Sequence, residues 1–112
     1  MKYVPKEKAQ RFEHDNIIAY EYDTEDNEIN CGVVEVKARH PKTGWIFNTK
    51  CKEIVYIAKG SGVFTTESES IHFKEGDMIF MDIMEKYFWE GNCILVAPAT
   101  PAWTLEQQKT AE

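Results

Sequence analysis

Two polar side chains, Glu53 and Tyr87, occur in apolar segments where strict alternation would point them into a protein interior. Glu53 shares a face with Val55 and Ile57, and Tyr87 shares one with Trp89. A carboxylate in an interior is costly unless it is protonated, hydrogen-bonded or opened to water, because burial disfavours its charged form. A carboxyl and a phenol placed together could hydrogen-bond a small polar ligand or transfer protons. We therefore expect these two residues to line a pocket.

The segments that carry these residues predict an antiparallel β-sandwich or barrel. Short runs rich in β-branched and aromatic residues recur between turns that contain glycine, which is typical of that architecture. The expected strands cover residues 17–22, 31–38, 45–49, 52–58, 63–66, 70–73, 78–81, 87–90 and 93–97. The chain contains no internal repeat, linker or low-complexity segment, so we expect a single domain over residues 1–112.

The two ends are expected to be less regular. Residues 5–12 predict a short helix, because a proline is tolerated at the first helical position and Ala9 and Phe12 are three residues apart. The tail, residues 98–112, is predicted to be irregular, since Pro98 and Pro101 exclude a central strand. We expect Trp103 to pack back on the body and the last residues to be frayed.

Composition excludes several classes of partner. The 13 basic and 19 acidic residues give a net charge of −6 without a basic stripe, so we expect no nucleic-acid partner. The first ten residues lack the apolar stretch of a secretory signal, and no apolar run is long enough to span a bilayer, which predicts a cytoplasmic protein without a membrane partner. Cys31, Cys51 and Cys93 are far apart and form no Cys-x-x-Cys motif, which favours buried apolar roles over disulfides or zinc ligands.

Two motifs resemble those of the cupin family. Six residues separate Glu53 from Gly60, as at the end of the first cupin motif, and Gly76-Asp77 opens an apolar strand, as at the start of the second motif. The resemblance covers residues 44–103. It implies an antiparallel double-stranded β-helix, the all-β jelly-roll sandwich of RmlC-like cupins, and this agrees with the strand pattern.

The resemblance also implies where a metal ion would bind. Metal-binding cupins place two histidines before the glutamate and a third histidine in the second motif. In this sequence the first two places fall on Phe47 and Thr49. With the longer spacing they fall on Ile46 and Asn48, and the third place falls on Tyr87. One carboxylate and a phenol are too few donors for a divalent ion, so we expect no metal and no cofactor.

The three histidines of the chain do not repair this deficit. His14 precedes the first expected strand, and His40 lies in an expected loop. His72 alternates with Phe73 and should face away from the core that Phe73 enters. We predict that all three are exposed to solvent.

The resulting hypothesis is a small stand-alone, metal-free cupin that binds a small polar molecule, such as a carbohydrate derivative, inside its barrel. Glu53 and Tyr87 would form a hydrogen-bonded pair and are the candidate catalytic residues. The full set of expected ligand-binding residues is Phe47, Thr49, Glu53, Phe80, Tyr87 and Trp89. Three alternatives stay open: a pair that only closes the core, a cupin-type isomerase or epimerase with Glu53 as acid or base, and a ligand-sensing module acting through a protein partner.

The outer faces of the same strands indicate a further partner. Ile54 and Tyr56 would point away from the interior, as would Phe88. Apolar residues on both faces indicate that the outer face is covered, either by the N-terminal strands or by a second subunit. Many proteins that resemble cupins pair two sandwiches, so we predict a homodimer.

Overall fold

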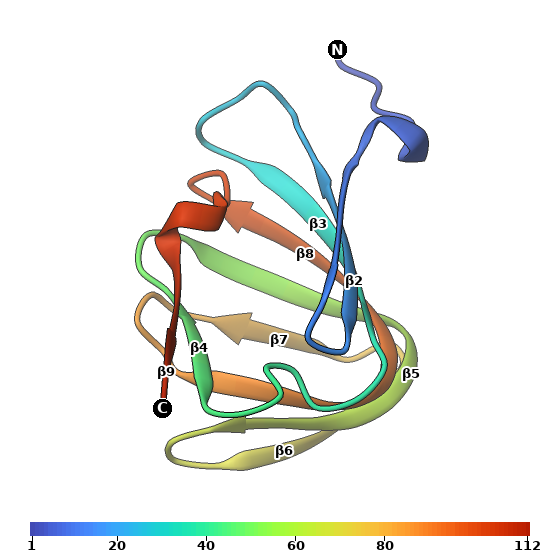
Figure 1. The fold of residues 1–112 in the computed structure, drawn as a ribbon. Coiled ribbons are helices and arrows are strands. Elements are labelled where there is room, and N and C mark those ends of the chain that lie inside the picture. Colours follow the sequence, from blue (N-terminus) through green and yellow to red (C-terminus); the bar gives the residue numbers. More distant parts are fainter.

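Nine antiparallel strands form one strongly curled sheet that closes on itself as a two-layered barrel (Figure 1). The computed structural model describes all residues 1–112. The elements in chain order are η1 (Lys6–Lys8), β1 (Gln10–His14), β2 (Ile17–Tyr22), β3 (Asn30–Val36), β4 (Trp45–Asn48), β5 (Lys52–Thr66), β6 (Ser70–Lys74), β7 (Met78–Met81), β8 (Tyr87–Thr100), η2 (Leu105–Gln107) and β9 (Gln108–Ala111). No helix in the chain is long and apolar enough to cross a membrane.

Two long strands, β5 and β8, connect the layers. They pair from Lys52 opposite Thr100 to Thr66 opposite Tyr87, with a register shift between Ile57 and Lys59. The first part of β5 also pairs with β7 and the second part with β6. Likewise, β8 pairs with β3 along its second half and with β4 at its start. Each long strand therefore belongs to both layers, and the two layers enclose one interior.

Glycines permit the two long strands to approach at their bend. Gly60 has a φ of +85°, and a Cβ atom there would lie 2.1 Å from the carbonyl oxygen of Asn92. Gly91 has a φ of +144°, and its added Cβ would lie 2.5 Å from the carbonyl oxygen of Ser61. Any larger residue at either position would separate the strands.

Side-chain alternation along β5 sets the interior. Glu53, Val55 and Ile57 are buried, whereas Ile54 and Tyr56 between them are about half exposed. The main core is a cluster of 15 buried hydrophobic residues drawn from β2 to β8. The predicted inward face of this strand is therefore confirmed, as is the all-β architecture.

The two ends of the chain differ from the predictions. Residues 5–12 do not form a helix: a single 3-10 turn is followed by β1, in which Phe12 pairs with Ala19 of β2. The tail also contributes a strand, because β9 pairs with β4. Pro98 lies inside β8 opposite Cys31. Proline is tolerated at this position because Pro98 has no partner in the ladder between β5 and β8, so its missing N–H removes no hydrogen bond from that ladder.

Candidate functional site

A cavity lies inside the barrel and is lined by strands from both layers together with the tail. It leaves about 90 Å³ for the centres of water-sized spheres, and since one water needs roughly 10–15 Å³ on that measure, the cavity has room for a small organic molecule. Its lining residues are Phe12, His14, Ile17, Ala19, Glu21, Gly32, Val34, His40, Glu53, Val55, Met81, Tyr87, Trp89, Leu95, Ala97, Trp103, Leu105 and Gln108. Most are apolar, and the ionisable ones are two carboxyls, two imidazoles and a phenol.

Glu53 projects into this cavity and is held by an amide rather than by Tyr87. Nδ2 of Asn48 donates a hydrogen bond of 2.7 Å to Oε1 of Glu53. The predicted hydrogen bond between Glu53 and Tyr87 is absent. Asn48 is the inward residue at the end of β4, and its side-chain amide contacts Glu53 in place of Tyr87.

The tail fixes the orientation of this amide. Oε1 of Gln107 accepts hydrogen bonds from the backbone N–H groups of Lys50 and Cys51, at 3.1 and 3.3 Å. Nε2 of Gln107 must therefore face Asn48, and it donates to Oδ1 of Asn48 at 2.8 Å. Since Oδ1 is thereby the acceptor, Nδ2 of Asn48 is the donor toward Glu53.

This chain of donors also determines where Glu53 carries a proton. Burial raises the pKa of Glu53 to about 7, although the hydrogen bond from Asn48 opposes the rise. Because Oε1 is engaged as an acceptor, the proton of the neutral acid is favoured on Oε2. Glu53 can therefore present an acidic O–H to the cavity near neutral pH.

A second carboxyl, Glu21, lies in the same cavity and was not among the predicted site residues. It follows Ile17 and Ala19 at period two along β2, so the alternation that placed Glu53 would also have placed Glu21 inside. Burial, followed by the charge of Glu53, raises the pKa of Glu21 to about 7. The two carboxyls are thus close enough to titrate as a coupled pair.

His40 is buried at the cavity wall, which corrects the prediction that it is exposed. Only 8% of its surface is accessible. The loop that carries His40 is tied to β8 by two backbone hydrogen bonds of 2.8 Å with Trp89. Strand alternation says nothing about such a loop residue. His14 and His72 are exposed as predicted, although His14 lies at the edge of the cavity with its ring 6.0 Å from that of His40.

The hydrogen bond of His40 determines its tautomer. Nδ1 lies 3.0 Å from the backbone oxygen of Asp15, which can only accept, so Nδ1 carries the hydrogen. Burial lowers the pKa of His40, against the opposing effects of the Asp15 carbonyl and carboxylate, and the neutral ring then leaves Nε2 as a lone-pair acceptor. Every fully occluded side-chain nitrogen or oxygen has a partner. Nε2 has none, so it is not fully occluded, and His40 lines the cavity.

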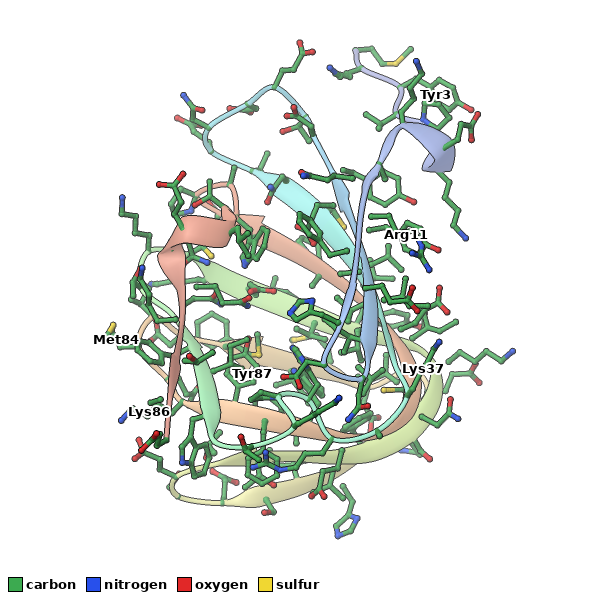
Figure 2. The ribbon with its side chains drawn as sticks, viewed as in Figure 1. Tyr3, Arg11, Lys37, Met84, Lys86 and Tyr87 are labelled. Carbon is green, nitrogen blue, oxygen red and sulfur yellow. The ribbon has the colours of Figure 1, made fainter.

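Aromatic rings form part of the cavity wall. Tyr87 and Trp89 are each 4% exposed, and both pack on Phe64, with ring centroids 5.4 and 4.5 Å apart respectively. Figure 2 shows Tyr87 inside the barrel and Met84 on its outer surface. Burial, followed by the nearby charge of Glu53, raises the pKa of Tyr87 well above its usual value, so its hydroxyl stays protonated.

Three of the residues expected at the site lie elsewhere. Phe47 and Thr49 do not line the cavity, because Ile46 and Asn48 are the inward residues of β4. Instead, Oγ1 of Thr49 donates to the backbone oxygen of Gln107 at 2.6 Å. Phe80 is 52% exposed on the outside of β7, since Met81 next to it faces inward. Of the expected set, the cavity brings together Glu53, Tyr87 and Trp89.

Few groups at this site could bind a metal ion. No cluster of three or more His, Cys, Asp or Glu side chains in the chain is arranged to hold one. Metal-binding cupins hold the ion with residues at four positions, and in this chain only Glu53 supplies a carboxylate there. The two positions before Glu53 lie on β4, whose inward residues are Ile46 and Asn48. An aliphatic side chain and an amide already committed to Glu53 do not fit a divalent ion.

A curled double-layered antiparallel sheet with a ligand-sized interior defines the cupin class of fold, and comparison with solved structures agrees. The chain superposes on Streptomyces Pac13, described as a nucleoside dehydratase and also solved with uridine, with a TM-score of 0.89, 22% identity and coverage of 100% of this chain and 92% of that one. KdgF from Halomonas gives a TM-score of 0.71 at 12% identity, covering 90% and 94%. An RmlC-like cupin from Shewanella frigidimarina gives 0.74 at 11% identity, covering 91% and 92%.

The fold is therefore that of a cupin, as the two motifs predicted. No family model matches the sequence, and no curated protein matches it either.

Proposed function

We propose that this chain is an acid–base enzyme that binds a nucleoside-like or sugar-derived molecule in the cavity and removes a proton from one of its carbon atoms. The observation that carries the proposal is that Nε2 of His40, a residue lining the cavity, has no hydrogen-bond partner and is left as a lone-pair acceptor because Nδ1 donates to the Asp15 carbonyl. A neutral imidazole in a largely apolar, aromatic-walled cavity is a suitable general base. The solved structure of Pac13 with uridine supports the ligand class.

A base at His40 and an acid at Glu53 together favour a reaction in which the substrate loses water. Nε2 of His40 would take a proton from a carbon atom made acidic by a neighbouring carbonyl, and the C–H electron pair would form a double bond. The hydroxyl on the adjacent carbon would leave with the proton from Oε2 of Glu53, as water. Turnover leaves His40 protonated and Glu53 ionised, and one proton transfer between them through solvent restores both.

The walls of the cavity would position the ligand. The ring faces of Trp89 and Trp103 offer surfaces on which a flat base or the apolar face of a sugar ring can stack. The hydroxyl of Tyr87, protonated throughout the neutral range, can donate to a ligand oxygen. Isomerisation or epimerisation uses the same first step, and the fate of the proton separates these reactions from dehydration.

Exchange with heavy water tests the first step across a range of candidate substrates. The protein would be incubated in D₂O with uridine and with a panel of nucleoside and sugar aldehydes and ketones, and products would be followed by mass spectrometry. Catalysis predicts uptake of deuterium or loss of the mass of water, abolished in His40→Gln and retained in the matched control His72→Gln. Binding of a panel member without either change would indicate a purely ligand-binding cupin and contradict the enzyme proposal.

We also propose that the protein is a homodimer. The outer β5–β7 patch consists of Ile54, Tyr56, Met78 and Phe80, all about half exposed. Adjacent strands place Ile54 opposite Phe80 and Tyr56 opposite Met78, so the four side chains form one continuous apolar surface. Phe88 is covered within the chain, by the guanidinium of Arg39 at 3.8 Å and by the ring of Trp45.

A further inference from the structure

We propose that Glu21 and Glu53 together form a subsite for a ligand ammonium group, so that the cavity prefers an aminated ligand and rejects phosphorylated or carboxylated ones. The inference rests on the proposed function in that it assigns a specificity to the same cavity. It adds a chemical class that neither the fold nor the acid–base chemistry of His40 requires.

The charge balance of the cavity is the first support. Its 18 lining residues include two glutamates and neither a lysine nor an arginine. A phosphate or carboxylate in this cavity would meet two carboxyls in a low-dielectric interior, without the basic side chains that such anions require. His40 does not compensate, because burial keeps it neutral. An ammonium group would instead find its counter-charge in place.

The placement of the two carboxyls is the second support. Glu21 pairs with Gly32, which in turn pairs with Ala97 of β8, and Glu53 pairs with Ala99 of the same strand. Ala97 and Ala99 are two residues apart and point to the same side, so both glutamates point to that side as well. Glu21 lies two strands from β8, beyond β3, and Glu53 lies on the other side of β8, and both side chains line the one cavity that the curled sheet encloses. The charge of Glu53 acts on Glu21, so when the pair is ionised its carboxyl oxygens can accept the hydrogens of a single ammonium group in the cavity between them.

Gly32 provides the space that the carboxyl of Glu21 occupies. A Cβ atom at position 32 would lie 2.2 Å from Oε2 of Glu21 and 3.1 Å from Oε1. The carboxyl therefore lies directly over the glycine, in a recess that any other residue would fill. No hydrogen bond contributes to the charge state of this carboxyl, whose oxygens are thus available to a ligand.

One polar group without a partner, on a nearly buried side chain, indicates that the same cavity takes a ligand. The indole N–H of Trp89 makes no hydrogen bond, although Trp89 is only 4% exposed. Since every fully occluded polar side-chain atom has a partner, this N–H is not fully occluded, and Trp89 lines the cavity. The rings of Trp89, Tyr87, Trp103 and Phe12 add the aromatic faces that attract a desolvated cation.

The charge of the pair suits a single ammonium group. Because both carboxyls have a pKa near 7, the pair keeps about one proton at neutral pH and carries about one negative charge. The charge of the pair also acts on Cys31, Cys51 and Tyr87, whose pKa values are all raised, so they stay neutral. His14 and His40 line the same cavity, and burial lowers the pKa of His40. Binding of a cation favours the ionised pair and so should release a fraction of a proton to the buffer.

Two matched ligand pairs test the subsite by calorimetry. One pair is uridine and the analogue in which an amino group replaces its primary hydroxyl, and the other is 2-phenylethanol and 2-phenylethylamine. Uridine monophosphate serves as the anionic probe. The expected result is a preference of about tenfold or more for the amine in at least one pair, equivalent to about 1.4 kcal/mol, with proton release and no binding of the phosphate. In Glu21→Gln the preference should fall to near unity, whereas the exposed Glu13→Gln should keep it.

The outcomes separate this inference from the proposed function. An amine preference with phenylethylamine but no binding of either nucleoside would support the subsite and count against a nucleoside ligand. Binding of uridine with equal or weaker binding of both amines would overturn the subsite and leave the proposed function standing. Absence of binding by both amines would likewise overturn it. If Glu21→Gln does not fold, Gly32→Ala displaces the same carboxyl and replaces it in the comparison.

Discussion

Nδ2 of Asn48 lies 2.7 Å from Oε1 of Glu53, and this one contact decides which oxygen of the buried acid faces the cavity as a proton donor. The side-chain amide of Asn48 has only one orientation that satisfies its neighbours. The side-chain oxygen of Gln107 accepts hydrogen bonds from two backbone N–H groups, so only its NH₂ group is left to face Asn48. The oxygen of the Asn48 amide is therefore the acceptor from Gln107, and its NH₂ group faces Glu53. The acid is thus oriented by residues that do not line the ligand cavity.

Replacing Asn48 by leucine should raise the pKa of Glu53 further. The hydrogen bond from Asn48 lowers this pKa against the larger effect of burial, so its loss leaves burial unopposed. Carboxyl chemical shifts followed through a pH titration would measure the change. Asn27→Leu, in an exposed loop, is the matched control. An unchanged or lower pKa of Glu53 would show that the contact does not stabilise its charged form.

The contribution of Glu53 to stability should fall as the pH rises from about 4.5 to about 7. Folding raises the pKa of Glu53 from 4.5 to about 7, so the folded state holds more protons than the unfolded state between these values. The contribution of this group is therefore most favourable below pH 4.5 and declines up to about pH 7, by about 3 kcal/mol for this group alone. Glu21 acts in the same direction but is coupled to Glu53, so the two effects do not simply add.

Urea unfolding at about pH 5 and about pH 8 measures this dependence. Glu53→Gln cannot ionise and should flatten the profile, with a gain in stability at the higher pH relative to the parent chain. Glu13→Gln, whose carboxylate is exposed, should leave the slope unchanged. A parent chain that becomes more stable between the two pH values would contradict the assignment.

His40→Gln should lower the rate of proton abstraction by roughly 10²–10⁴-fold, the usual contribution of a general base. Gln can keep a hydrogen bond to Asp15 but offers no basic nitrogen. The measurement is deuterium uptake into any ligand found to bind, with circular dichroism to confirm the fold. Unaltered exchange in this variant would remove His40 from the mechanism.

Gly32→Ala should disturb the ligand preference far more than the stability. The added Cβ collides with the end of a flexible side chain, Glu21, which can move away, so we expect a loss of no more than about 1 kcal/mol. The moved carboxyl would no longer face Glu53, and the preference for amines should fall. Equal ligand preference in the variant and the parent would mean that the recess over Gly32 does not place the carboxyl.

Charges placed in the outer β5–β7 patch should prevent dimerisation. Light scattering coupled to size exclusion would give the mass of the parent chain, of Tyr56→Lys and of Phe80→Lys. A dimeric parent and monomeric variants are expected, because a lysine would be desolvated at the interface. Ile29→Lys, at an equally exposed apolar residue in a loop, should stay dimeric. A monomeric parent would end the proposal.

Period-two alternation accounts for the part of the site that could be predicted. It placed Glu53 beside Val55 and Ile57, and Tyr87 beside Trp89, on inward faces, and all of them are buried. These residues sit in regular strands, where the face of a side chain follows from its position alone. The two glycine-punctuated motifs then defined the fold, which superposition on solved cupins confirms.

The remainder of the site depends on contacts between segments far apart in the sequence. His40 is turned inward by a backbone bridge to Trp89, and the orientation of Asn48 depends on Gln107, 59 residues further along. No local pattern encodes either contact. The inward position of Glu21, by contrast, follows from alternation along β2. It was not predicted, because an inward acid was expected only in the motif that resembles cupins. Phe80 was misplaced by one residue in the same alternation.

The tail, residues 103–108, completes the site after the rest of the barrel has formed. Trp103, Leu105, Gln107 and Gln108 are synthesised after both long strands, and they supply one wall of the cavity and the start of the hydrogen-bonded amide chain. A chain cut after residue 102 would keep Glu53 and His40, the acid and the base. It would lack Gln107, which fixes the orientation of the Asn48 amide, so Asn48 would become the oriented donor to Glu53 only once the tail has docked.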